Sequence, residues 1–149
     1  RKGAVFKKVS EEQFIGDCSN AFGNDNILDI RKKYKEINLP KRSTRFSAGH
    51  DICTPFDVKL CPGEKLMIPT GIRCEMSEEY VMLIFPPVVL ELKGMTISNT
   101  VPVVDADYFF ADNEGHIFIS IKNNGMIFGI ESGEKIVQAV FVPFGVADE

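Results

Sequence analysis

The spacing of the hydrophobic residues changes along the chain and divides it into two regions. In the first region, residues 10–13 form a capping-box pattern, Ser followed three positions later by Gln, which predicts the start of a short helix. Asp25 or Asn26 then precedes apolar residues at helical spacing and predicts a second helix. Pro40 ends this helix, because proline disfavours the helical conformation in the residue before it. Residues 1–38 are therefore predicted to be a helical N-terminal extension.

From Cys53 onward, apolar residues alternate with polar ones, which is the two-residue period of a half-buried β-strand. The run at residues 80–85 is apolar throughout and predicts a strand buried on both faces. Turn signals separate such segments at intervals of about 8–12 residues, which is typical of an all-β barrel or sandwich. Residues 39–149 are therefore predicted to form one β domain. Its expected strands are residues 56–60, 66–68, 72–76, 80–85, 95–104, 116–121 and 136–144.

Composition narrows the class of protein. The chain has 149 residues, which is a single-domain length, and a net charge of −4, which gives no basic footprint for direct nucleic-acid binding. No apolar run approaches the ~18 residues of a membrane span, so no membrane partner is expected. The four cysteines lack the close spacing of a zinc ribbon and are interpreted as reduced thiols, which favours a cytoplasmic location.

Four short motifs occur in a fixed order. They read SAGHDI at residues 47–52, FPPVVLELK at 85–93, NTVPVVDADY at 99–108 and GEKIVQ at 133–138. Together they resemble the motifs of the trimeric dUTPase family, and the likeness runs from Leu39 to the end of the sequence. The resemblance implies a jelly-roll β-barrel subunit, a homotrimer with active sites at the subunit interfaces, and a deoxyuridine nucleotide as ligand. The implied reaction is attack of water on the α-phosphorus of dUTP, giving dUMP and pyrophosphate.

The resemblance also implies roles for two carboxylates and a tyrosine. Asp51 matches the aspartate that holds Mg²⁺ through water, and Mg²⁺ prefers carboxylate, water and phosphate oxygens. Asp105 matches the aspartate that orients the attacking water, a role for which an ionised carboxylate is suited because it only accepts hydrogen bonds. Tyr108 matches the tyrosine that packs on deoxyribose and excludes a 2′-hydroxyl. Residue type alone leaves simpler interpretations open: turn aspartates for Asp51 and Asp105, and a half-buried strand tyrosine.

Two amides complete the implied site. Asn99 matches a residue of the uracil pocket, where an amide offers both a donor and an acceptor. Gln138 matches the fourth-motif glutamine that contacts the phosphates. A turn asparagine and a surface glutamine are the alternatives.

The two histidines are given no role in catalysis. His116, beside an acidic turn, is interpreted as a structural histidine, and no role is assigned to His50, which replaces the aromatic residue usual in the first motif.

The second motif departs from the family. The family has Pro-Arg-Ser-Ser, whereas here Pro87 stands in place of the arginine and Val88 in place of the first serine. Arginine offers a planar fork to phosphate oxygens and serine offers a hydroxyl, while Pro87 has neither a side-chain donor nor a backbone N–H. Pro102 also replaces a glycine of the third motif, and the family's fifth motif, a glycine-rich arm with Arg and Phe, is not found up to Glu149.

These departures leave three hypotheses. The first is a dUTP diphosphatase whose phosphate-binding positions, Pro87 and Val88, are impaired. The second is a catalytically inactive nucleotide-binding or regulatory relative. The third is a dCTP deaminase, which shares the fold but needs a Ser-Arg pair and a general-acid/base Glu that are not recognisable in this sequence.

Overall fold

The computed structural model describes residues 3–23, 26–87, 94–98, 100–126 and 128–149. Its elements in chain order are β1 (Ala4–Lys8), α1 (Glu11–Phe22), α2 (Ile27–Glu36), β2 (Lys41–Arg42), β3 (His50–Cys53), β4 (Val58–Leu60), β5 (Lys65–Pro69), β6 (Ile72–Met76), β7 (Tyr80–Phe85), β8 (Met95–Ile97), β9 (Val103–Val104), the 3-10 helix η1 (Ala106–Phe110), β10 (Phe118–Asn123), β11 (Phe128–Ile130) and β12 (Lys135–Pro143). The prediction of a mainly β fold with two N-terminal helices is confirmed.

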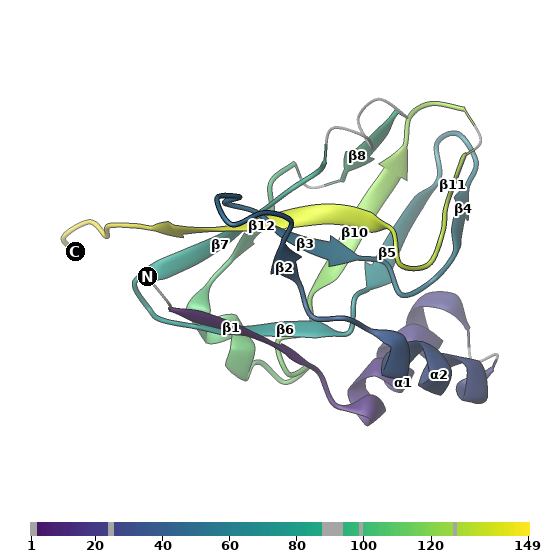
Figure 1. Ribbon diagram of the computed structural model, residues 1–149, viewed down its shortest axis with the longest axis horizontal. Coiled ribbons are helices and arrows are strands. Elements are labelled where there is room, and N and C mark those ends of the chain that lie inside the picture. Colours follow the sequence, from purple (N-terminus) through teal and green to yellow (C-terminus); the bar gives the residue numbers. More distant parts are fainter. Residues whose placement is uncertain (1–2, 24–25, 88–93, 99, 127) are drawn as a thin grey trace.

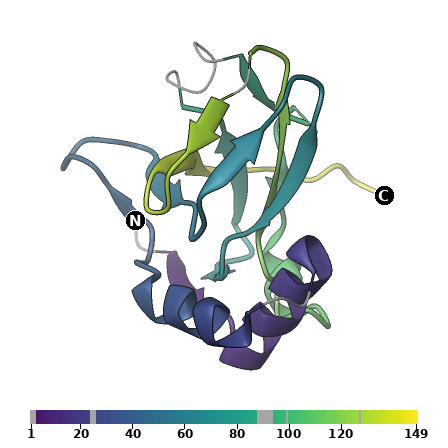
Figure 2. The same cartoon turned by 90° about the vertical axis from the view of Figure 1, so that its right-hand side faces the viewer.

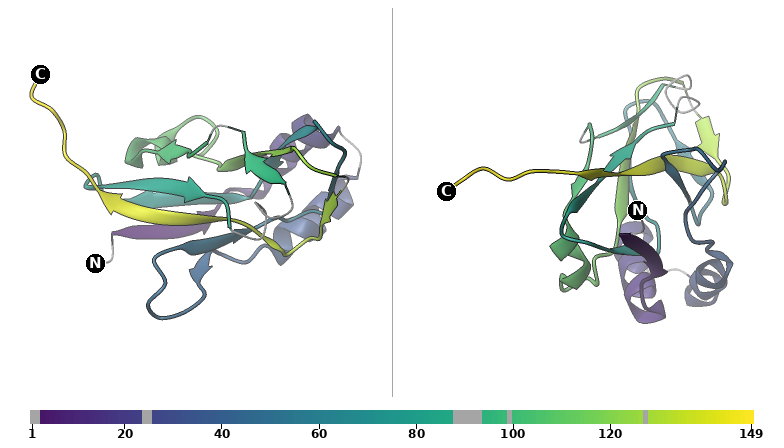
Figure 3. Two further views of the ribbon diagram at one scale, coloured as in Figure 1. Left: turned by 90° about the horizontal axis from the view of Figure 1, so that it is seen from above. Right: turned by 60° about the vertical axis from the view of Figure 1, so that its left-hand side comes forward.

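The strands form antiparallel sheets around one core. The largest sheet has the order β2-β3-β12-β7-β9, and the others are β5-β10-β8, β1-β6 and β11-β4. The core lies between these sheets and is rich in isoleucine and methionine, with Ile68, Met82 and Ile119 all fully buried. Both helices lie together at one end of the molecule, while the segment after β12 projects away from the body (Figures 1 and 3).

Several elements differ from the prediction. The expected strand 95–104 is divided into β8 and β9, because Thr100 adopts a positive φ of 64° and Pro102 has no N–H for a ladder. Strand β7 was expected to be buried on both faces, but in the chain its residues alternate between buried and partly exposed. Strands β1, β2, β3 and β11 were not predicted. β2, β3 and β11 have only two to four residues, and β1 is held by its pairing with β6.

The helical caps follow the sequence pattern. Ser10 Oγ accepts a hydrogen bond from the backbone N–H of Gln13 at 3.1 Å, as the capping-box pattern predicted. At α2 the cap is Asn26, whose side chain accepts from the N–H of Asp29 at 3.2 Å. The helix ends at Glu36, before the proline predicted to stop it.

Among the described residues, no helix combines the length and apolar character needed to cross a membrane.

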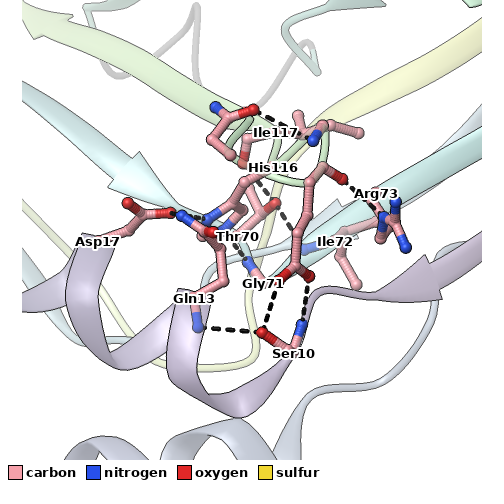
Figure 4. A network of polar contacts seen from close by, with 12 residues as sticks. Ser10, Gln13, Asp17, Thr70, Gly71, Ile72, Arg73, His116 and Ile117 are labelled. Atoms are coloured by element: carbon pink, nitrogen blue, oxygen red, sulfur yellow. Dashed lines mark hydrogen bonds and ion pairs between the residues drawn. The ribbon is translucent and has the colours of Figure 1, made fainter. Parts of the chain in front are cut away.

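The helices contact the β domain through a buried histidine. Phe14 and Cys18 of α1 pack with Val9 and Ile30 in a small apolar cluster, and Figure 2 shows both helices against one end of the sheets. Beside this cluster, fully buried His116 accepts the N–H of Gly71 at Nε2 over 2.8 Å. Its proton must therefore be on Nδ1, which donates to the Asp17 carboxylate at 2.6 Å (Figure 4). The interpretation of His116 as a structural histidine is confirmed.

Burial gives this histidine a pH dependence. The pKa of His116 lies below its usual value of 6.5, mainly because burial disfavours the charged ring, and the neighbouring carboxylates of Asp17 and Glu114 partly oppose the shift. A protonated Nε2 would also face the N–H of Gly71, donor against donor. Between the folded-state pKa and about 6.5 the unfolded chain therefore binds more protons than the folded chain, so stability rises with pH in this interval.

We predict that the free energy of unfolding decreases as the pH falls from 7.5 to 5. The measurement is urea unfolding followed by circular dichroism. The control is His116→Gln, since a glutamine can accept from Gly71 and donate to Asp17 without titrating. His50 keeps some pH dependence in this variant, because burial lowers its pKa too. The variant should show a flatter profile, and a slope as steep as that of the unaltered protein would contradict the assignment.

Candidate functional site

The first, second and fourth motifs meet in the largest sheet. Gln138 on β12 lies directly opposite Asp51 on β3 and, on its other side, opposite Phe85 at the end of β7. Side chains directly opposite one another in an antiparallel pair lie about 4.5–5.5 Å apart at Cβ and interact. The strand register therefore places the implied metal-binding aspartate beside the implied phosphate-binding glutamine.

The glycine of the first motif packs directly against Gln138. A Cβ built on Gly49 would overlap the amide oxygen of Gln138 and lie 3.1 Å from its Cβ, closer than most real contacts. Gly49 is buried, so a side chain there could not turn outward into solvent. The first and fourth motifs are thus linked sterically: the absence of a side chain at Gly49 leaves the space that Gln138 occupies.

Asp51 lies among cationic side chains. Its carboxylate is 22% exposed and 3.4 Å from Nζ of Lys135, and Lys41 on β2 is its partner on the other strand. No group of three metal-binding side chains occurs in the described part of the chain. A single carboxylate nevertheless suits Mg²⁺, which commonly takes one or two protein carboxylates and completes its octahedron with waters and substrate phosphates. The residues present therefore fit a metal held mainly by a bound triphosphate.

The third motif forms a separate site. The chain leaves β9 at Val104 and enters η1, with Asp105 at the N-cap position and Tyr108 in the helix. Asp105 is exposed, and its side chain makes no capping hydrogen bond to the described residues, so the carboxylate is available to a ligand. Because η1 spans Ala106–Phe110, Tyr108 lies on a 3-10 helix and is not the strand tyrosine that residue type alone left open. Both residues line a groove of about 490 Å³ that also includes Ile84, Pro102 and Phe118.

The hydroxyl of Tyr108 is fully engaged within the protein. It donates to the backbone oxygen of His116 at 2.6 Å and accepts from Nδ2 of Asn113 at 3.0 Å. The part of this side chain left to contact a ligand is the ring. Sequence reasoning missed Asn113.

The two groups are far apart within one chain. Gln138 lies level with Phe85 of β7, whereas Val104 lies level with Met82, so Asp105 is displaced both along the strands and across the sheet. On a flat sheet with about 4.8 Å between strands and about 3.3 Å per residue, this offset would separate Asp51 from Asp105 by a distance on the order of 20 Å. At that separation, Asp51 and Asp105 of one chain cannot both act at the reacting phosphorus of one nucleotide.

The altered second motif is partly described. Pro87 lies two residues beyond the end of β7 and is buried, and it offers no donor to a phosphate. Val88 and Asn99 lie outside the described residues, so the predictions made for them stay predictions.

His50 has a simple structural explanation. Its ring packs against Phe6 and Phe141 with centroid separations of 5.6 and 5.4 Å, so it occupies the place of the aromatic usual in this motif. The Lys135–Asp51 ion pair was missed by sequence reasoning. The position of Lys135 in the sequence does not predict its contact with Asp51, because the contact depends on an irregularity in the β12–β3 register.

Comparison with known proteins identifies the family. A model of the dUTPase family matches residues 35–148. The deoxyuridine 5'-triphosphate nucleotidohydrolase of Lactococcus lactis subsp. lactis (strain IL1403) is 42% identical over 129 residues, which is 81% of this chain and 84% of that protein. The enzyme of the same name from Shigella flexneri serotype 5b (strain 8401) is 36% identical over 122 residues, covering 78% and 77% of the two chains.

Comparison with solved structures indicates the same family. The crystal structure of dUTPase from Streptococcus mutans superposes with a TM-score of 0.74 at 29% identity, covering 97% of this chain and 98% of that one. The chain belongs to the dUTPase family.

We predict that Gly49→Ala lowers kcat/KM for dUTP by about tenfold or more, since displacing Gln138 removes a hydrogen bond to a charged group worth ~1.5–3 kcal/mol. The measurement is pyrophosphate release under steady-state conditions. The matched control is Gly16→Ala on the exposed face of α1, where an added Cβ meets nothing within 4 Å. If Gly49→Ala and Gly16→Ala have the same kcat/KM, Gln138 does not contact the substrate.

Proposed function

We propose that the protein is a Mg²⁺-dependent dUTP diphosphatase, a homotrimer in which each active site combines residues of neighbouring copies. The observation that carries the proposal is the arrangement of the motifs: Asp51 and Gln138 lie side by side on one part of the surface, and Asp105 and Tyr108 line a groove elsewhere. The relatives that are 36–42% identical over most of the chain, all named as dUTP nucleotidohydrolases, support the same activity.

The chemistry divides between these two groups. The carboxylate of Asp105 accepts a proton from the attacking water and directs the oxygen at the α-phosphorus, and its exposure at a helix N-cap leaves both oxygens available. The amide of Gln138 donates to a phosphate oxygen. Asp51 would hold Mg²⁺ through water, and the bound ion would neutralise part of the triphosphate charge.

The ring of Tyr108 selects the sugar. Because its hydroxyl is bonded within the protein, the ring is fixed in the groove and presents an apolar face to the nucleoside. An apolar face in contact with C2′ leaves no space or hydrogen-bond partner for a 2′-hydroxyl. In this proposal Asn99 supplies the hydrogen bonds to uracil.

Cationic side chains lie near the first motif, but none of the described contacts joins them to Pro87. A shallow groove of about 680 Å³ is lined by Lys41, Arg42, Arg45 and His50. Lys41 is the strand partner of Asp51, whereas Arg42 and His50 alternate with that pair and face the other side of the sheet. Lys41, Arg42 and Arg45 supply positive charge near the first motif, whereas Pro87 supplies no donor at the arginine position of the second motif. The phosphate grip is therefore weaker than in the family pattern, and the turnover is slow.

One observation favours a second candidate function. Pro87 is buried and has no donor, and loss of one transition-state donor typically lowers kcat about 10²–10³-fold. A protein that binds deoxyuridine nucleotides without hydrolysing them is the alternative.

Two observations support the trimer: the separation between Asp51 and Asp105, and the exposed apolar side chains near the third motif. Two groups on the order of 20 Å apart act on one nucleotide only if they come from different copies. Apolar side chains near the third motif also face outward: Val103 is 63% and Phe110 is 77% exposed. A second copy covering them would remove this surface from water.

We predict that Asp105→Asn lowers dUTP hydrolysis by at least about a hundredfold, because an amide is a poor proton acceptor for the water. The assay is pyrophosphate release with Mg²⁺ and with EDTA, where EDTA should abolish activity. The control is Asp112→Asn, an exposed carboxylate of the loop after η1 that does not line the groove. Turnover by Asp105→Asn equal to that of the control would refute the role of Asp105. Binding of dUTP without any release by the unaltered protein would establish the alternative.

We predict a mass of about three times the 16.6 kDa of the chain by light scattering coupled to size exclusion. Replacing exposed Val103 with Asp should shift the mass toward that of the monomer, since a buried unpaired charge opposes assembly. A single species of the monomer mass in the unaltered protein would show that the trimer does not form.

A further inference from the structure

We propose that Asp17, on the N-terminal helix α1, is a positioning residue for the ring of Tyr108, and that through His116 it sets the preference of the site for deoxyribose over ribose. The inference rests on the proposed function, in which Tyr108 faces the sugar. It assigns to the N-terminal helices a part in substrate selection, although they contribute no residue to the groove.

The first link joins Tyr108 to the backbone of His116. The phenol donates to the His116 backbone oxygen at 2.6 Å, and Asn113 Nδ2 donates back to the phenol at 3.0 Å. One end of the ring is thus fixed by η1 and the other by the segment that follows it. A displacement of His116 would move the hydroxyl and tilt the ring in the groove.

The second link joins His116 to α1. Its Nδ1–H donates to Asp17 Oδ2 at 2.6 Å, and the same oxygen accepts from Nε2 of Gln13 at 2.9 Å, which fixes the carboxylate on the helix. The opposite nitrogen of His116 accepts from the N–H of Gly71. The imidazole is held from both sides, by α1 and by the turn before β6, as Figure 4 shows.

The segment between Tyr108 and His116 has little freedom to absorb a shift. Glu114 has a positive φ of 62° and receives two hydrogen bonds from Ser10, from its N–H at 2.7 Å and from its hydroxyl at 2.6 Å. A Cβ on Gly115 would lie 2.6 Å from the Tyr108 backbone oxygen, so this turn packs directly on η1. Arg73 holds the same turn through the backbone oxygens of Glu114 and Phe109, at 2.6 and 2.9 Å.

Selectivity is the property most sensitive to this arrangement. Exclusion of a 2′-hydroxyl depends on van der Waals contact, so a ring that can tilt by a fraction of an ångström admits the extra oxygen. Asp51 and Gln138 lie outside these contacts, so the grip on the phosphates is unchanged. Loss of the contact between α1 and His116 should therefore raise the affinity for ribonucleotides by a larger factor than it lowers the affinity for deoxynucleotides.

The experiment measures binding, so that it does not depend on turnover. Non-hydrolysable analogues of dUTP and UTP are titrated by calorimetry into the unaltered protein, Asp17→Ala and the control Glu12→Ala. Glu12 is an exposed carboxylate in the first turn of the same helix. The affinity ratio of the dUTP analogue to the UTP analogue should fall at least about fivefold in Asp17→Ala and remain unchanged in Glu12→Ala. Asp17→Asn, which keeps an acceptor for the imidazole N–H, should give an intermediate ratio.

A double-mutant cycle separates positioning from a general loss of stability. Tyr108→Phe keeps the ring but removes the hydroxyl bonded to His116, so Asp17→Ala added to it should change the ratio no further. If Asp17→Ala does not fold, as judged by circular dichroism, Asp17→Asn takes its place in the cycle. Independent effects of the two substitutions, or an unchanged ratio in both Asp17 variants, would overturn the inference and leave the proposed function standing. Binding of neither analogue to the unaltered protein would overturn both.

Discussion

The pairing of β12 with β3 on one side and β7 on the other is the constraint on which the first half of the site depends. It places Gln138 between Asp51 and Phe85, so that three motifs distant in sequence meet at one level of one sheet. Val137 and Ala139 on either side are fully buried, and a slip of one residue would exchange them with Gln138 and bury the amide. The hydrophobic alternation of β12 therefore fixes the position of a polar contact, and Gly49 provides the space for it.

The second half of the site depends on a different part of the structure. The segment from η1 to His116 is held by β6 through Arg73 and by α1 through Ser10 and Asp17. The N-terminal region is consequently held to the segment that lines the groove, even though the matched family model begins at residue 35. In the proposed trimer, each copy of the chain would therefore offer parts of two sites.

Much of the fold followed from local patterns. Ser10 and Asn26 act as the helix caps, and strands β5, β6 and β7 follow hydrophobic patterns that need no long-range information. The strand β1 and the helix η1 were not predicted, because they depend on tertiary contacts. The division of the expected strand 95–104 was also missed, although it follows from the local conformation at Thr100 and from Pro102. In the site, the strand register brings Asp51 and Gln138 together and one groove includes Asp105 and Tyr108, while the roles that the motifs imply for them stay predictions. The Lys135–Asp51 ion pair and the Asn113–Tyr108 bond could not be predicted, since both join residues whose proximity only the folded chain creates.

Subunit complementation tests most directly whether each site is built from two copies. Asp51→Asn and Asp105→Asn are purified separately, each inactive, then unfolded together and refolded as a mixture. With random assembly of a cyclic trimer, about a quarter of the interfaces combine an intact Asp51 from one chain with an intact Asp105 from its neighbour. The account predicts that dUTP hydrolysis returns to about a quarter of that of refolded unaltered protein. A mixture that forms trimers but remains as inactive as each variant alone would contradict it.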